Sequence, residues 1–185
     1  GAVALADTLK PDSIAAVQAM QQQGLQLHIM SGDKAEVVAH IARQLGIAHA
    51  QGNMSPRDKA QAVQDLTAAG KTVAMVGDGV NDAPALAAAA VSFAMKDGTD
   101  VAEHTAHATL MRHSVAQVGQ ALWIARATVS NIRQNLFFAF FYNCLGIPLA
   151  AFGWLNPVLA AVAMTLSSVS VISNALRLKR VKVPL

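Results

Sequence analysis

The stretch Gly77-Asp78-Gly79-Val80-Asn81-Asp82 directly follows a short β-type run at residues 72–76. It places two carboxylates and a carboxamide side by side, and its glycines let a phosphate approach the backbone closely. Crowded carboxylates repel one another unless a hard cation neutralises them, and Mg²⁺ takes one or two carboxylates together with water and phosphate oxygens. The turn therefore predicts a magnesium-dependent phosphate site.

Short β-type runs alternate with helical patterns on both sides of this turn. Strands are expected at residues 25–30, 72–76, 91–95 and 108–110, and helices at 12–23, 34–45 and from 56 to about 69. The alternation predicts a Rossmann-like α/β domain whose parallel sheet is covered by helices on both faces. Chemistry in such sheets lies at the carboxyl ends of the strands, where a second polar turn, Ser31-Gly32-Asp33, also falls.

Beyond residue 113 the pattern becomes helical and then apolar. We expect a domain at 1–113, a connecting helix at 114–135, membrane helices at 136–154 and 157–176, and a basic tail at 177–185. No charged residue lies between Arg133 and Arg177. At about 1.5 Å per residue, each apolar segment can cross a hydrocarbon core of about 30 Å. The interpretation is a transmembrane hairpin, and its alternative is a buried helical pair in a soluble protein.

Composition and charge narrow the class of protein. The 185 residues are 54% hydrophobic and 14% charged, which excludes a disordered chain. The net charge is +3, yet all 11 acidic residues lie at or before Glu103, and the basic residues beyond it flank the apolar segments. This pattern indicates anchoring in a lipid bilayer with both outer ends cytoplasmic, and it argues against a nucleic-acid partner.

The longer string GDGVNDAPAL at residues 77–86 is similar to the hinge motif of P-type ATPases, whose phosphorylation domain is of the haloacid dehalogenase type. Ser31-Gly32-Asp33 resembles their TGD loop, with serine in place of threonine, and Lys59 resembles the lysine that balances phosphoryl charge. The resemblance implies that Asp78 binds Mg²⁺. It also implies that Asn81 and Asp82 hold phosphate and complete the magnesium shell, and Gly79 belongs to the same cofactor-binding turn. Asp33 is expected to orient its loop or to contact the nucleotide domain.

The resemblance runs from Ala4 to Arg180, and it departs at Ser31, at Lys96-Asp97 and in the short link between the apolar segments. The family's DKTGT motif, which carries the phosphorylated aspartate, and its CPC motif do not occur in the sequence. We therefore expect the domain to lack its first strand and the chain to be the C-terminal part of a longer protein. ATP would be used by the intact enzyme, and the chain alone would be inactive.

Two groups of polar residues interrupt the apolar segments. Tyr142-Asn143 and the set Met164, Ser167 and Ser168 resemble the YN and MxxSS motifs of the copper-transporting branch. A thioether with neutral oxygens suits a soft monovalent cation, Cu⁺ or equally Ag⁺, and suits Zn²⁺ or Ca²⁺ poorly. For each residue alone, ordinary helix packing is the alternative. Cys144 is either a further sulfur ligand or a packing residue.

These patterns together predict a copper(I)-exporting P-type ATPase in a bacterial inner membrane. In the intact protein, Mg²⁺-dependent formation and hydrolysis of an aspartyl-phosphate would drive Cu⁺ transport. The direction of transport follows from the resemblance alone. Two alternatives stay open: a membrane-tethered phosphatase of the haloacid dehalogenase type that transports nothing, and a non-catalytic copper-binding fragment.

Overall fold

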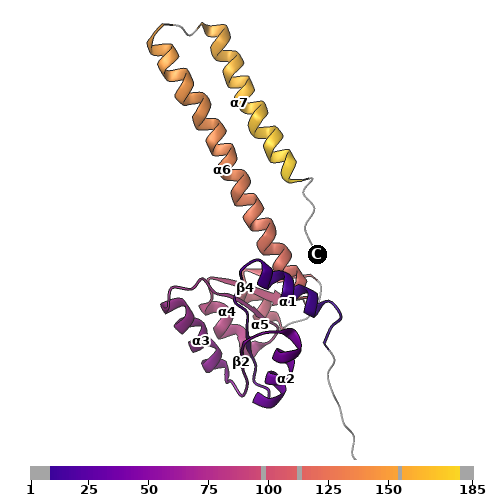
Figure 1. The fold of residues 1–185 in the computed structure, drawn as a ribbon. Coiled ribbons are helices and arrows are strands. Elements are labelled where there is room, and N and C mark those ends of the chain that lie inside the picture. Colours follow the sequence, from indigo (N-terminus) through magenta and orange to yellow (C-terminus); the bar gives the residue numbers. More distant parts are fainter. Residues whose placement is uncertain (1–8, 97–98, 112–113, 154–155, 180–185) are drawn as a thin grey trace, which may run out of the picture. The chain divides into compact units, whose positions relative to one another are not determined.

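The computed structural model describes residues 9–96, 99–111, 114–153 and 156–179 (Figure 1). Predictions that concern Asp97 and most of the basic tail lie outside these residues. The chain divides into two units, formed mainly by residues 1–119 and by residues 120–184, and each is described by itself.

The first unit alternates helices and strands as predicted. Its elements are α1 (Ser13–Gln22), β1 (His28–Met30), α2 (Ala35–Leu45), β2 (His49–Gln51), α3 (Pro56–Ala68), β3 (Ala74–Gly77), the 3₁₀ turn η1 (Val80–Asp82), α4 (Ala83–Ala88), β4 (Val91–Met95), α5 (Asp100–Thr105) and β5 (Ala108–Leu110). The three predicted helices and four predicted strands are confirmed, although β1 begins at His28. Three short elements, β2, α4 and α5, were not predicted.

All strand pairs are parallel, as predicted, but the strands form two sheets rather than one. β1 pairs with β2, with His28 opposite His49, and β4 lies between β3 and β5, with Phe93 opposite both Val76 and Ala108. Among the described strands, β1 and β3 each pair on one side only. Each of them therefore keeps an edge of unpaired backbone groups that could accept another strand.

The apolar core holds the carboxyl end of β3 in place. Val63 of α3 packs with Ala85 of α4 and with Ala89, which follows that helix, and Leu86 packs with Ala94 of β4 and Ala102 of α5. Val63 and Leu86 are fully buried. Helices α3 and α4 are thereby fixed against the sheet on either side of the turn that follows β3.

The start of α3 carries a complete capping box. Ser55 Oγ accepts the Asp58 N–H at 3.3 Å, and the Ser55 N–H donates to Asp58 Oδ2 at 2.8 Å. Pro56 occupies the first turn, where its missing N–H costs nothing. Because these bonds satisfy two of the free donors at the helix start, they define where α3 begins and hence the position of Lys59 one turn later.

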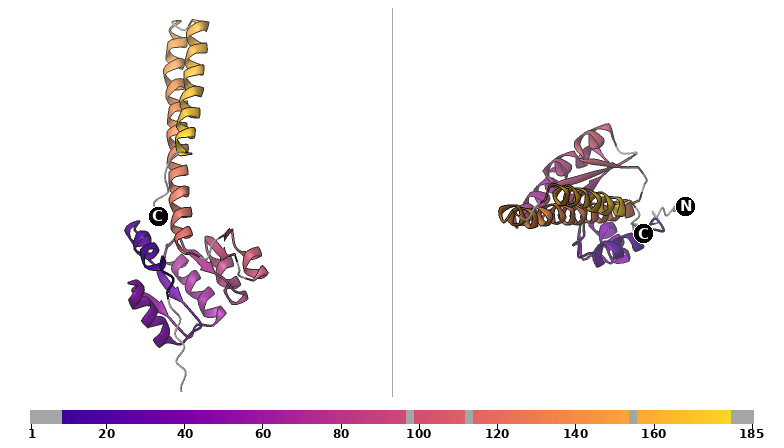
Figure 2. Two further views of the ribbon diagram at one scale, coloured as in Figure 1. Left: turned by 90° about the vertical axis from the view of Figure 1, so that its right-hand side faces the viewer. Right: turned by 90° about the horizontal axis from the view of Figure 1, so that it is seen from above.

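The second unit is a pair of helices. The predicted connecting helix and first apolar segment form one helix, α6 (Ala116–Ala151), which includes Pro148, and α7 (Pro157–Leu178) follows. Asn156 caps α7 by accepting the Val158 N–H. The two helices run antiparallel and side by side (Figures 1 and 2). Among the described residues, Val158–Leu178 is the helix recognised as long and apolar enough to cross a membrane.

Replacement of the α3 cap tests its contribution. We expect Ser55→Ala to destabilise the start of α3 by about 1 kcal/mol, because the Asp58 N–H loses its acceptor. Amide hydrogen exchange in the first turn of α3 should then be about fivefold faster. The matched control is Lys34→Ala, since Lys34 precedes α2 without a side-chain capping bond. Equal exchange in wild type and Ser55→Ala would contradict the role of the cap.

The same cap should respond to acid. Hydrogen bonding to Ser55, through its side chain and then its backbone, lowers the pKa of Asp58. A carboxylate with a lowered pKa stabilises the fold above the ordinary aspartate pKa of about 3.9, and the stabilisation is lost as the pH falls through the lowered pKa. The difference in unfolding midpoint between wild type and Asp58→Asn should therefore be constant from about pH 5 to 8 and shrink in stronger acid. A difference that grows on acidification would contradict this.

Candidate functional site

The turn after β3 is shaped by close contact between Gly77 and Asp82. A Cβ atom placed on Gly77 would lie 2.7 Å from Asp82 Cβ and 2.9 Å from Asp82 Oδ2. Position 77 must therefore lack a side chain, because Asp82 packs directly on its backbone. This contact folds the turn back on the end of the strand.

Both carboxylate oxygens of Asp82 are engaged. Oδ1 accepts from Lys59 Nζ at 2.7 Å, and Oδ2 accepts the Asp78 N–H at 3.3 Å. The Lys59 and Asp82 side chains are each 12% exposed. The predicted proximity of Lys59 to the turn is thus observed, and α3 is tied to η1 by a shielded charge-assisted bond.

Asp78 and Asn81 lie on the open side of the same turn, where both are exposed. The Asp78 carbonyl accepts the N–H of Thr99, the residue that caps α5, at 2.9 Å. The backbone of Asp78 is therefore fixed while its carboxylate is accessible. Thr99 was missed by sequence reasoning, although its place just before Asp100 is a typical N-cap signal.

The carboxylates of this turn can supply only some of the oxygen ligands that Mg²⁺ needs. Among the described residues, no group of three or more His, Cys, Asp or Glu side chains could enclose a metal. Mg²⁺ needs only one or two carboxylates when phosphate and water supply the remaining oxygens. Asp78 is free to serve as such a ligand, whereas Asp82 already holds the ammonium of Lys59. The two carboxylates therefore have different surroundings: Asp78 is exposed, and Asp82 is paired with Lys59.

The predicted Ser31 loop is held in a compact conformation. Ser31 Oγ donates to Asp33 Oδ2 at 2.8 Å and accepts the Asp33 N–H at 3.2 Å. The backbone of the next turn supports it, since Met54 N–H donates to the Ser31 carbonyl and Asn53 N–H to the Asp33 carbonyl. Asp33 is therefore hydrogen-bonded within its own loop, beside the exposed Gly32.

The Ser31 loop and the Asp78 turn follow the carboxyl ends of strands in different sheets. Among the described residues, no hydrogen bond joins the two loops. The connection runs through α3, which begins just after the turn that supports Ser31 and delivers Lys59 to Asp82. The segment from Asn53 to Lys59 therefore contacts both loops, the Ser31 loop through its backbone and Asp82 through the Lys59 side chain.

A cavity of about 470 Å³ beside β1, β2 and α3 is separate from this turn. It is lined by residues that include His28, His49, Met30 and Asp65. The His28 and His49 rings stack with their centroids 4.5 Å apart, and burial together with the neighbouring His49 lowers the pKa of His28. The lowered pKa makes His28 a weaker source of positive charge for phosphate than an ordinary histidine.

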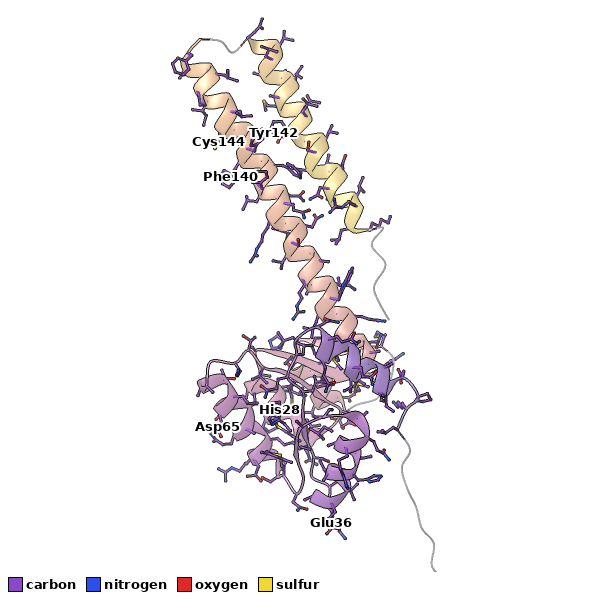
Figure 3. All side chains as sticks on the ribbon, viewed as in Figure 1. His28, Glu36, Asp65, Phe140, Tyr142 and Cys144 are labelled. Atoms are coloured by element: carbon purple, nitrogen blue, oxygen red, sulfur yellow. The ribbon has the colours of Figure 1, made fainter. Side chains whose placement is uncertain are left out.

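In the second unit, the five predicted copper residues fall on two different faces. Tyr142 and Ser167 lie in the half-buried strip between the helices, whereas Asn143, Met164 and Ser168 are exposed, Met164 by 73%. Figure 3 shows Tyr142 on the side of α6 toward α7 and Cys144 pointing away. Tyr142 Oη lies 3.4 Å from Ser170 Oγ, a residue that sequence reasoning missed.

The exposed members bond within their own helices. Asn143 Nδ2 donates to the Ala139 carbonyl, and Ser168 Oγ donates to the Met164 carbonyl. The hairpin by itself therefore does not bring the five side chains together around one point. Met164 and Ser168 lie one turn apart and are both exposed, whereas Ser167, which the spacing of three and four residues would place on the same face, is half-buried.

Comparisons with known proteins match the domain and also the chain as a whole. The family model for haloacid dehalogenase-like hydrolases matches residues 1–90. The chain is 63% identical over 98% of its length to a probable cation-transporting ATPase of Haemophilus influenzae, covering 25% of that protein. It is 46% identical to a probable copper-importing P-type ATPase A of Enterococcus hirae and 47% identical to a copper-exporting P-type ATPase of Bacillus subtilis. These matches cover 97% and 98% of the chain and 25% and 23% of those relatives.

A solved structure extends the similarity across both units. The crystal structure of a zinc-transporting PIB-type ATPase in the E2.Pi state matches with a TM-score of 0.85 and 39% identity, over 94% of this chain and 28% of that one. The chain thus spans about a quarter of the length of the relatives it matches. Over nearly its whole length, in the domain and in the helices, the chain is therefore similar to part of the P-type ATPases.

Proposed function

We propose that this chain forms the phosphorylation-domain and membrane-hairpin part of an ATP-driven copper(I) pump. The observation that carries the proposal is the ion pair between Lys59 and Asp82, which fixes the turn that presents Asp78. An ammonium and an exposed carboxylate at the end of a parallel strand are the groups that phosphoryl transfer requires. The relatives named above support ATP-driven transport over a tethered phosphatase, because they match across the helices as well as the domain.

Each residue of the domain has a distinct part in this proposal. Asp78 would hold Mg²⁺, with Asp82 as second candidate, and the ion would supply charge neutralisation on the phosphoryl oxygens. Lys59 places a positive charge beside the same oxygens, and Ser31 offers a hydroxyl and Asn81 an amide. Asp33 keeps the Ser31 loop in shape. The phosphorylated aspartate would come from a segment outside this sequence, and the unpaired edges of β1 and β3 offer it a place in the sheet.

The cation is proposed from the chemistry of the hairpin. All acidic residues lie at or before Glu103, so no carboxylate is present in α6 or α7. Neutral oxygens with the Met164 sulfur suit Cu⁺ or Ag⁺, whereas Zn²⁺ favours imidazole, thiolate or carboxylate ligands. Tyr142, Asn143, Met164, Ser167 and Ser168 are the proposed ligand set. The exposed Asn143, Met164 and Ser168 would meet ligands from other helices of the whole protein.

The proposed location is a bacterial inner membrane, crossed by both apolar segments. Arg126 and Arg133 precede these segments, and Arg177 and Lys179 follow them, which favours cytoplasmic placement of both outer ends. Outward transport matches the name of the Bacillus relative, whereas the Enterococcus relative is named as an importer. Copper uptake into inside-out vesicles, expected for an exporter, would distinguish the two directions.

The domain assignment predicts the effect of one carboxylate. Asp78→Asn in the whole pump should lower Mg²⁺-dependent, copper-stimulated ATP hydrolysis by at least about a hundredfold, because the metal loses a charged ligand. Asp65→Asn is the control, since Asp65 is an exposed acid of α3 that bonds to Gln61. Hydrolysis near the wild-type rate in Asp78→Asn would refute the assignment.

The cation assignment predicts the effect of one sulfur. Met164→Leu keeps the size of the side chain and removes its thioether, so the dissociation constant for Cu⁺ should rise about tenfold or the number of bound Cu⁺ should fall. Leu159→Met is the control because it alters a similarly exposed side chain of the same helix. Unchanged affinity and stoichiometry, measured by competition with a Cu⁺ chelator, would remove Met164 from the ligand set.

A further inference from the structure

Three asparagines join α6 to α7 at the end of the hairpin opposite its connecting loop. Asn174 Nδ2 donates to Asn135 Oδ1 at 2.9 Å, Asn135 Nδ2 donates to Asn131 Oδ1 at 3.1 Å, and Asn131 Nδ2 donates to the Asn174 carbonyl at 2.7 Å. The bonds form a closed ring across the two helices. Asn174 is 9% exposed and is the buried polar residue of this unit among those the structure describes.

The asparagines belong to the seam along which the helices meet. On α6 the half-buried positions include Asn131, Asn135, Phe138 and Tyr142, and on α7 Ser167 and Ser170 are half-buried and Asn174 is buried. These positions recur at intervals of three and four residues, as in a coiled coil. Residues between them on either helix are mostly exposed. The asparagine ring and Tyr142 therefore lie on one continuous contact line.

Antiparallel geometry relates the ring to the proposed copper residues. Tyr142 lies two turns beyond Asn135 on α6, and Ser167 lies two turns before Asn174 on α7. When Asn135 and Asn174 are held opposite each other, Tyr142 is brought level with the α7 stretch from Ser167 to Ser170. The contact of 3.4 Å between Tyr142 Oη and Ser170 Oγ agrees with this register.

The rest of the seam cannot hold the helices together as firmly. Lipid is as apolar as the side chains it would replace, so the hydrophobic effect does not drive the helices together in a bilayer. Small residues such as Ala163, Ser167 and Gly146 allow close approach without selecting one arrangement. A polar amide on a helix seam does select one, because each alternative leaves a donor or acceptor unpaired.

We propose that Asn131, Asn135 and Asn174 form an asparagine clasp that closes the hairpin at its charged end and positions Tyr142 against α7 for cation binding. The loop after α6 ties the helices at one end, and the clasp ties them at the other. The three asparagines are positioning residues and do not touch the cation. The effect of the clasp on Cu⁺ binding rests on the proposed copper site, whereas its effect on the position of Tyr142 does not.

The first test measures the position of Tyr142 in the whole pump in native membranes. In a Cys144→Ser background, Tyr142→Cys and Ser170→Cys should be joined by a short bismaleimide cross-linker, because the native side chains at these positions meet across the seam. Adding Asn174→Leu or Asn135→Leu should lower the yield at least about fivefold, because the clasp opens. Adding Thr165→Val should leave it unchanged, since the Thr165 hydroxyl bonds within its own helix. An undiminished yield in both asparagine variants would overturn the proposal.

A matched pair of substitutions distinguishes the loss of one hydrogen bond from general misfolding of the hairpin. Asn135→Asp keeps the oxygen that accepts from Asn174 and loses only the bond to Asn131 within α6, whereas Asn174→Asp removes the amide that donates across the helices to Asn135. Both introduce the same charge at the same level of the hairpin. The cross-link should persist in Asn135→Asp and fall in Asn174→Asp. Equal yields in these two variants would contradict the hydrogen-bond arrangement.

The second test measures Cu⁺ binding with the native Tyr142. Asn174→Leu should raise the Cu⁺ dissociation constant about tenfold, and the double variant Asn135→Leu/Asn174→Leu should be no weaker than the worse single one, because both act through the same bond. If the losses of Cu⁺ affinity in the two single variants added up in the double variant, the proposal that Asn135 and Asn174 act through one bond would be overturned. If the wild-type pump binds no Cu⁺ while the cross-linking results hold, the copper proposal fails and the clasp stands.

Discussion

The ion pair between Lys59 and Asp82 is the interaction on which the arrangement of the domain depends. It joins two segments separated by 23 residues, and both side chains are largely shielded from water. Shielding strengthens the attraction but makes it costly to leave either group alone, so the helix and the turn must come together with their charges matched. Gly77 makes the geometry possible, because any side chain there would collide with Asp82.

Around this pair, the supporting contacts are mainly backbone ones. The cap at Ser55 and Asp58 sets the first turn of α3, Thr99 holds the carbonyl of Asp78, and the backbone at Asn53 and Met54 holds the Ser31 loop. The side chain of Asp78 is consequently left exposed, while its position is determined by bonds to its backbone N–H and carbonyl. This separation of support from function is a general means of preorganising a site.

The sequence predicted those features that depend on local pattern. Helices α1, α2 and α3 were predicted because an apolar stripe and end signals agree, and the Ser55-Pro56 start of α3 was correct to the residue. Strand β2 was not, because His49-Ala50-Gln51 is short and mostly polar and becomes a strand only through pairing with β1. The division into two sheets depends on pairing between distant segments, and the engagement of Asp82 depends on side-chain packing. Neither can be deduced from periodicity.

The unbroken course of α6 has a mechanical consequence. An α-helix is stiff along its axis because every turn is tied to the next, so an axial push or twist applied at Gln120, where the second unit begins, reaches Tyr142 through unbroken helix. Pro148 lacks the N–H that would bond to the preceding turn, and it lies beyond Tyr142, toward the connecting loop. We therefore expect bending near Pro148, and the part of α6 that leads to Tyr142 transmits motion as a rigid helix.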